Sequence, residues 1–162
     1  MDGRVWSAFT FQRGSCDAPE LTGAIAVWGP MFPAATRILY AEDNENDFVL
    51  LRYAFTQTKL PAELLFVSSG PAAIDYLTTQ PEPALVVLDI NLPGVSGFDV
   101  LEWLRTQKPQ FHAPVILWTA SLRPYDLERA TALRATQLAK KPGTLEGYVT
   151  FARELATRLR GG

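Results

Sequence analysis

Short runs of apolar residues alternate with longer stretches in which apolar residues recur at helical spacing. The short runs cover 37–41, 63–67, 84–88, 115–118 and 136–139. The helical stretches cover 47–59, the segment from Gly70 to the prolines at 81 and 83, 97–107, 124–134 and a last segment that begins at Thr144 and reaches Arg158. Strands that are apolar on both faces and alternate with helices are typical of a parallel sheet covered on both sides. The pattern therefore predicts an α/β fold with a five-stranded, doubly wound parallel sheet.

Residues at two of the expected helix starts support these boundaries. Ser96 precedes the segment 97–107, and its hydroxyl can accept a hydrogen bond from an unpaired N–H group of the first turn. Pro124 suits the first turn of a helix, where a backbone N–H has no partner. We therefore expect helices to begin directly after Ser96 and at Pro124.

Residues 1–36 differ from the rest, because they show no sustained periodicity and contain several glycines and prolines. They also contain aromatic residues, which are unusual in a linker: Trp6, Phe9, Phe11, Trp28 and Phe32. The segment is either a loose tail, with a true start at Met31, or a short element that docks on the domain through 24–28. Since termini are loose unless contacts hold them, we expect a loose N-terminal extension over 1–36 and a domain over 37–160.

Composition narrows the functional classes. The 162 residues carry 15 Lys and Arg against 17 Asp and Glu, and a net charge of −2 does not suggest nucleic-acid binding. The single histidine, His112, excludes a zinc site with two histidine ligands. The single cysteine, Cys16, excludes an intrachain disulfide and fits a reducing compartment, so we expect a cytoplasmic protein. No apolar run reaches the roughly 18 residues of a membrane span, so we expect no membrane segment.

Polar residues gather where the predicted strands end. Glu42 and Asp43 follow the first strand, Asp89 the third, Thr119 the fourth and Lys141 the fifth. The carboxyl ends of parallel strands meet at one edge of a sheet, so these side chains should converge. Each alone could be a helix cap or a surface charge, but their joint placement favours a site. Clustered carboxylates call for a cation such as Mg²⁺, and a carboxylate beside Mg²⁺ and a lysine is a nucleophile for a phosphoryl group.

Motifs over the domain resemble those of bacterial response-regulator receiver domains. They are I-L-Y-A-E-D-N at 38–44, L-V-V-L-D-I-N-L-P-G-V-S-G at 85–97, V-I-L-W-T-A-S at 115–121 and K-K-P at 140–142. The resemblance implies a flavodoxin-like (βα)5 fold and a phosphorylated signalling switch that is not an enzyme acting on external substrates. The runs E-D-N-E-N-D at 42–47 and S-G-P-A-A-I-D-Y-L at 69–77 resemble stand-alone receivers that partner phytochrome-type histidine kinases.

The resemblance also implies a role for each residue at the strand ends. Asp89 would accept the phosphoryl group from a kinase phosphohistidine, Thr119 would move its hydroxyl toward that group, and Lys141 would pair with one of its oxygens. The remaining role is the binding of Mg²⁺. Its ligands would be Asp43, Asp89, the backbone carbonyl of Asn91 and, mostly through water, Glu42.

The chain departs from the family pattern at two positions near the expected output surface. Leu138 stands where the family usually has an aromatic residue, and Arg134 stands where it often has a glycine at a helix end. Because the last predicted helix reaches Arg158, we expect no output domain after it. Output should then occur by protein contact, as a homodimer or with an output protein. The expected contact surface is the helix 124–134, the strand 136–139 and the last helix. The residues expected to form this interface are Leu138, Tyr148, Glu128, Arg129 and Arg134.

Three rival functions are weaker. An aspartyl phosphatase usually needs a second Asp two residues after the nucleophile, where this chain has Asn91. A dinucleotide-binding enzyme needs a G-x-G-x-x-G motif after the first strand, and none is present. A receiver that signals without phosphate is disfavoured because the whole set of site residues is retained.

Overall fold

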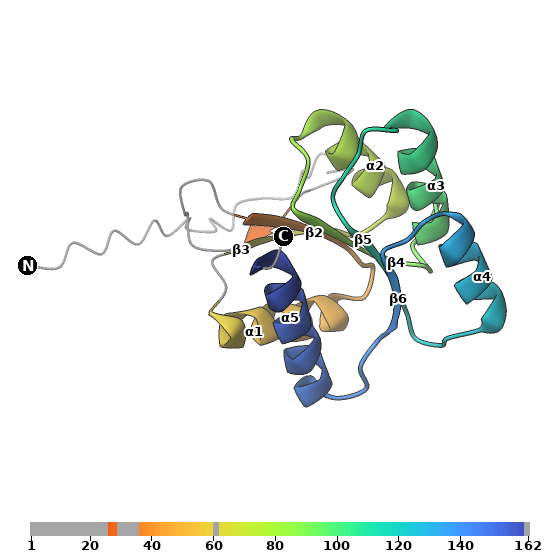
Figure 1. Ribbon diagram of the computed structural model, residues 1–162. Coiled ribbons are helices and arrows are strands. Elements are labelled where there is room, and N and C mark those ends of the chain that lie inside the picture. The colour runs from red at the N-terminus through yellow and green to blue at the C-terminus, as the bar shows by residue number, and fades with distance from the viewer. Residues whose placement is uncertain (1–25, 29–35, 60–61, 161–162) are drawn as a thin grey trace, which may run out of the picture.

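The computed structural model describes residues 26–28, 36–59 and 62–160 (Figure 1). The elements, in chain order, are β1 (Ala26–Trp28), β2 (Thr36–Ala41), α1 (Glu45–Thr58), β3 (Ala62–Val67), α2 (Gly70–Thr79), β4 (Leu85–Asp89), α3 (Gly97–Gln107), β5 (Val115–Thr119), α4 (Pro124–Ala132), β6 (Gln137–Lys140) and α5 (Leu145–Arg160). Within the described residues no helix is both long and apolar enough to cross a membrane.

The strands form one sheet in the order β1-β3-β2-β4-β5-β6. The five strands from β2 to β6 pair in parallel, which confirms the predicted doubly wound sheet. Their bounds differ from the expected ones by one residue at most positions. The start of α3 at Gly97 is as predicted, and Ser96 caps it in a box closed by Asp99.

The edge strand β1 is an addition to the predicted fold. It pairs antiparallel with β3, with Ala26 opposite Phe66 and Trp28 opposite Leu64. These three residues therefore dock on the domain, as one of the two interpretations of the N-terminal extension predicts, and they are not part of a loose tail. Thr36, the last residue of the expected extension, begins β2, and the other residues of the extension, including Met31, lie outside the described part of the chain.

Helices cover both faces of the sheet. In Figure 1, α1 and α5 lie below the sheet, and α2 and α3 lie above it. Side chains alternate between the faces, so each central strand is buried on both sides: in β5, Leu117 packs on the α2 and α3 side and Trp118 on the α1 and α5 side. This two-sided burial accounts for the continuous apolar runs.

The end of α4 comes two residues earlier than predicted. Arg134 takes a left-handed conformation (φ 54°), which a helix cannot continue. The N–H of Ala135 donates to the carbonyl of Ala130 at 2.9 Å, and that of Arg134 donates to Thr131 at 3.0 Å. These two bonds define a Schellman motif with arginine at the position that glycine usually holds.

Candidate functional site

The candidate site lies at the edge of the sheet where the parallel strands end. Glu42 follows β2, Asp89 ends β4, Thr119 ends β5, and Lys141 follows β6. The backbone beside Asp89 is closely packed: a Cβ at Gly97 would lie 2.2 Å from the Asp89 carbonyl oxygen. Glycine at this position therefore lets α3 begin directly against the end of β4.

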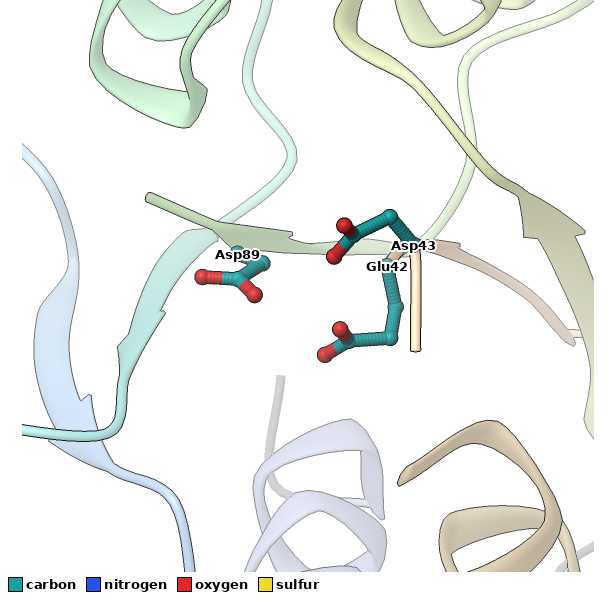
Figure 2. Close-up of side chains that lie close together, drawn as sticks. All are labelled: Glu42, Asp43 and Asp89. Atoms are coloured by element: carbon teal, nitrogen blue, oxygen red, sulfur yellow. The ribbon is translucent and has the colours of Figure 1, made fainter. Parts of the chain in front are cut away.

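Three carboxylates meet at this edge. Glu42, Asp43 and Asp89 each offer a carboxylate oxygen, and these oxygens lie within 4.8 Å of one another. Figure 2 shows the side chains of Asp43 and Glu42 extending toward Asp89. Glu42 is fully buried and Asp89 is 3% exposed, whereas Asp43 is exposed. The cluster is thus open to solvent on the Asp43 side.

Glu42 is held by partners on both of its oxygens. The Tyr40 hydroxyl donates to Oε2 at 2.9 Å, the Asn44 N–H donates to Oε1 at 3.1 Å, and Lys141 Nζ lies 2.6 Å from Oε2. Burial raises the pKa of Glu42 to about 7, against the opposing effect of the Lys141 hydrogen bond, and the charge of Asp89 raises it further. Any added positive charge near this carboxyl would therefore stabilise its ionised form.

Lys141 supplies the positive charge of the site. Its Nζ lies 2.6 Å from Asp89 Oδ2, 2.6 Å from Glu42 Oε2 and 3.0 Å from Asp47 Oδ2. Burial disfavours the ammonium, but its hydrogen bonds to Asp89 and Glu42 outweigh burial and raise the pKa of Lys141. The lysine therefore stays charged between its carboxylate partners.

Asp47 is a site residue that the sequence reasoning missed. It lies in the first turn of α1, after the N-cap Asn44, and not at the end of a strand. Its Oδ1 accepts a hydrogen bond from the Tyr148 hydroxyl at 2.7 Å, while its Oδ2 contacts Lys141. The only sequence signal was its place at the end of the acidic run 42–47.

Asn91 follows β4 and Thr119 ends β5, and only Asn91 forms a hydrogen bond with Asp89. The Asn91 N–H donates to Asp89 Oδ1 at 2.9 Å, which orients the carboxylate. The Thr119 hydroxyl donates to the Ser121 carbonyl at 2.9 Å and accepts from the Ser121 N–H at 3.2 Å. Both hydrogen bonds of this hydroxyl are therefore with the loop that follows β5, and neither is with Asp89.

Two residues expected on the output surface have different environments. Tyr148 is 2% exposed, because its ring packs in the core under α1 and α5 and its hydroxyl reaches Asp47. Its assignment to an exposed interface was therefore wrong. Leu138 is half-buried and packs against the core on the α2 and α3 side of the sheet. Lys140, beside Lys141, is exposed.

The fold and the acidic edge together define a doubly wound α/β domain with an acidic pocket. Residues 38–151 match the family of response regulator receiver domains, so the chain belongs to this family. Its members are signalling domains that pair with histidine kinases and hold Mg²⁺ at an acidic pocket. The polar-differentiation response regulator DivK of Brucella ovis is 36% identical over 112 residues, which cover 69% of this chain and 89% of DivK.

Solved structures of receivers are also similar. The phosphorylated cyanobacterial phytochrome response regulator RcpA aligns with a TM-score of 0.68 and 26% identity, over 75% of this chain and 91% of RcpA. The response regulator RPA3017, from red light signalling in R. palustris, aligns with a TM-score of 0.67 and 30% identity, over 74% and 90% of the two chains. These similarities agree with the resemblance found in the runs 42–47 and 69–77.

Proposed function

We propose that this protein is a response regulator that accepts a phosphoryl group on Asp89 from a histidine kinase, in a Mg²⁺-dependent reaction. The observation that carries the proposal is the setting of Asp89. Its carboxylate is nearly buried at the end of the central strand β4, with Lys141 Nζ 2.6 Å from Oδ2 and the Asn91 N–H 2.9 Å from Oδ1. A nucleophile that is nearly buried and fixed by two donors is positioned for attack.

The residues present fit a magnesium ion. The carboxylate oxygens of Glu42, Asp43 and Asp89 lie within 4.8 Å of one another, and oxygen atoms are the ligands that Mg²⁺ prefers. Asp43 is exposed and forms no hydrogen bond or ion pair with a residue that the structure describes, so it is free to bind the ion directly. Glu42 already has three protein partners, which suits contact through water, and the Asn91 carbonyl would complete the protein ligands.

The reaction is a transfer between two protein side chains. An Asp89 carboxylate oxygen attacks phosphorus, the bond between phosphorus and the kinase imidazole nitrogen breaks, and its electrons remain on that nitrogen. The bound cation would offset the negative charge of the transferred oxygens. Lys141 Nζ lies 2.6 Å from Asp89 Oδ2 and would pair with one of those oxygens, so that its positive charge offsets part of the negative charge of the phosphoryl group.

The phosphorylated form would signal through changed protein contacts. The Thr119 hydroxyl would leave Ser121 and turn to the phosphoryl group, which would draw the loop before α4 inward. The surface of α4, β6 and α5 adjoins this loop, and we propose it as the contact for a second copy or an output protein. With Leu138 half-buried in place of an aromatic ring, the change would be a shift of backbone and of α4.

The kinase we propose is of the phytochrome type. Support comes from three similar proteins: the phytochrome response regulator RcpA, RPA3017 from red light signalling, and the bacteriophytochrome response regulator AtBRR. A manganese-bound structure of the similar regulator Rcp1 supports a divalent cation at the acidic cluster. The proposed location is the cytoplasm, where a histidine kinase draws on ATP.

Intact mass after incubation with a small phosphodonor and Mg²⁺ tests the proposal. The wild type should gain one acid-labile phosphoryl group, and Asp89→Asn should gain none. Phosphorylation of Asp89→Asn would overturn the assignment.

The Mg²⁺ dependence of the rate tests the proposed ligands. Asp43→Ala should need far more Mg²⁺ for the same rate, and Glu42→Gln should have the smaller effect because its contact is through water.

A shortened chain tests the bounds of the domain. A chain that starts at Met31 should react like the full chain, because the site lies within 37–160.

A further inference from the structure

The ammonium of Lys141 has three donor hydrogens and three carboxylate partners. Two of these, Asp89 and Glu42, belong to the strand ends that form the pocket. The third, Asp47, comes from helix α1 and holds Nζ at 3.0 Å. Lys141 is 13% exposed in its side chain, so water has little access to take the place of a lost partner. Asp47 therefore completes the set of acceptors around the lysine.

Asp47 is in turn fixed from a different direction. The Tyr148 hydroxyl donates to its second oxygen at 2.7 Å, and Tyr148 lies in α5. The Tyr148 ring is buried and lies 5.9 Å from the Trp118 ring, centroid to centroid. A carboxylate with each oxygen bound to a different element has little freedom to move. Its position thus depends on the packing of α1 against α5.

We propose that Asp47 is a positioning residue of the phosphorylation site, which holds the Lys141 ammonium beside Asp89 and is itself held by Tyr148. The inference rests on the proposed function of Asp89 and Lys141. Lysine has a long, flexible side chain, and a fixed third acceptor restricts both the place of Nζ and the directions of its hydrogens. Small displacements of a group that contacts the reacting atoms lower rates strongly.

A simpler role for Asp47 has to be separated from this one. An acidic residue in the first turn of a helix also stabilises the helix dipole. Glu45 lies in the same turn, is exposed and is not among the carboxylates that pair with Lys141, so Glu45→Gln removes a similar charge without removing the positioning contact. This variant is the matched control for Asp47→Asn.

The first measurement is the rate of phosphorylation by a small phosphodonor at saturating Mg²⁺, followed by intact mass. Asp47→Asn should react about tenfold more slowly than wild type, Tyr148→Phe about threefold more slowly, and Glu45→Gln at the wild-type rate. The double variant of Asp47 and Tyr148 should react no more slowly than Asp47→Asn, because Tyr148 acts through Asp47. In a Lys141→Ala background, Asp47→Asn should cause no further loss.

The second measurement needs no phosphodonor. Three acceptors should slow exchange of the Lys141 ammonium hydrogens with water, so its ¹⁵Nζ signal should be visible by NMR in the wild type. The signal should be lost in Asp47→Asn, weakened in Tyr148→Phe and unchanged in Glu45→Gln. Tyr148→Phe keeps the buried ring, so it tests the same contact if Asp47→Asn folds poorly.

The outcomes separate this inference from the proposed function. An Asp47→Asn variant with the wild-type rate and an unchanged Lys141 signal would overturn the role of Asp47 and leave Asp89 as the acceptor. An equal loss of rate from Asp47→Asn in the Lys141→Ala background would also overturn it, because Asp47 would then act independently of the lysine. Absence of phosphorylation in the wild type would instead overturn the proposed function, and the role of Asp47 in it.

Discussion

The two faces of the sheet are built from different side chains. The core between the sheet and α1 and α5 holds a set of packed aromatic rings: Tyr40, Phe48, Phe66, Trp118, Tyr148 and Phe151. The core on the opposite face, under α2 and α3, consists mainly of leucine, valine and alanine. The central side chains of both cores are buried, so the two cores differ in the types of side chain and not in the degree of burial.

The difference between the faces lies in their polar atoms. On the aromatic face, the hydroxyls of Tyr40 and Tyr148 reach the site and donate to Glu42 and Asp47. On the aliphatic face, the one tyrosine hydroxyl, that of Tyr76, does not reach the site. Each face also holds one buried polar group without a hydrogen-bond partner among the described residues, Trp118 Nε1 on the aromatic face and the Tyr76 hydroxyl on the aliphatic face. We infer that the aromatic core both stabilises the fold and positions the site, whereas the aliphatic core only stabilises the fold.

The largest expected effect is that of Trp118→Ala. Its ring lies 5.8 Å from Tyr40 and 5.9 Å from Tyr148, centroid to centroid, so its loss leaves a cavity beside both hydroxyl donors. We expect the free energy of unfolding to fall by about 3–5 kcal/mol and the phosphorylation rate of the folded protein to fall as well. Denaturant unfolding and intact mass measure the two effects.

Leu117→Ala is the matched change on the other face, one residue earlier in the same strand. The side chain is fully buried in the aliphatic core, so stability should fall by about 2–5 kcal/mol. The phosphorylation rate, measured where the variant is folded, should stay at the wild-type value. An equal loss of rate in the two variants would show that the faces do not differ in function.

The next effect is that of Tyr40→Phe, which removes only a hydroxyl. Its bond to Glu42 is to a carboxylate, and the loss should lower the free energy of unfolding by about 1.5–3 kcal/mol. Tyr76→Phe removes a hydroxyl without a partner and should leave stability unchanged or raise it. Thermal and denaturant unfolding of both variants give the comparison, and a larger loss from Tyr76→Phe would contradict it.

The fold and the strand-end residues were predictable because both depend on local patterns. A strand buried on two faces must be apolar throughout, and the residue that follows it must lie at the carboxyl edge. Glu42, Asp43, Asp89 and Lys141 therefore come together as the sequence indicates. The three residues of β1 were too few to show a strand pattern.

The second half of the site depends on packing, which the sequence pattern does not contain. Asp47 joins the site only because α1 packs against α5 and brings it to Tyr148. The spacing of Tyr148 with the other apolar residues of its helix places it on the buried face. The spacing does not show that its hydroxyl points to the edge of the sheet. Thr119 is at the predicted place, yet its hydroxyl bonds Ser121, since the direction of a hydroxyl is set by the loop that follows.

The smallest expected effect is a gain in stability on the side of the sheet away from the aromatic core. Arg134 has a φ of 54°, a conformation that costs a side-chain-bearing residue about 1–2 kcal/mol and glycine almost nothing. Arg105 donates hydrogen bonds to the carbonyls of Leu133 and Arg134. Burial lowers the pKa of Arg105, and the positive charge of Arg134 lowers it further. Arg134→Gly keeps both carbonyls and should raise the free energy of unfolding by about 0.5–1 kcal/mol.

Arg134→Ala separates the two causes of this gain, because it removes the charge and keeps the strained backbone. The alanine variant should gain less stability than the glycine variant in denaturant unfolding, and both should be phosphorylated at the wild-type rate. Equal stability of the two would show that the left-handed conformation costs nothing here. A change in rate would show that the end of α4 influences the site, and the division of roles between the two faces would then fail at α4.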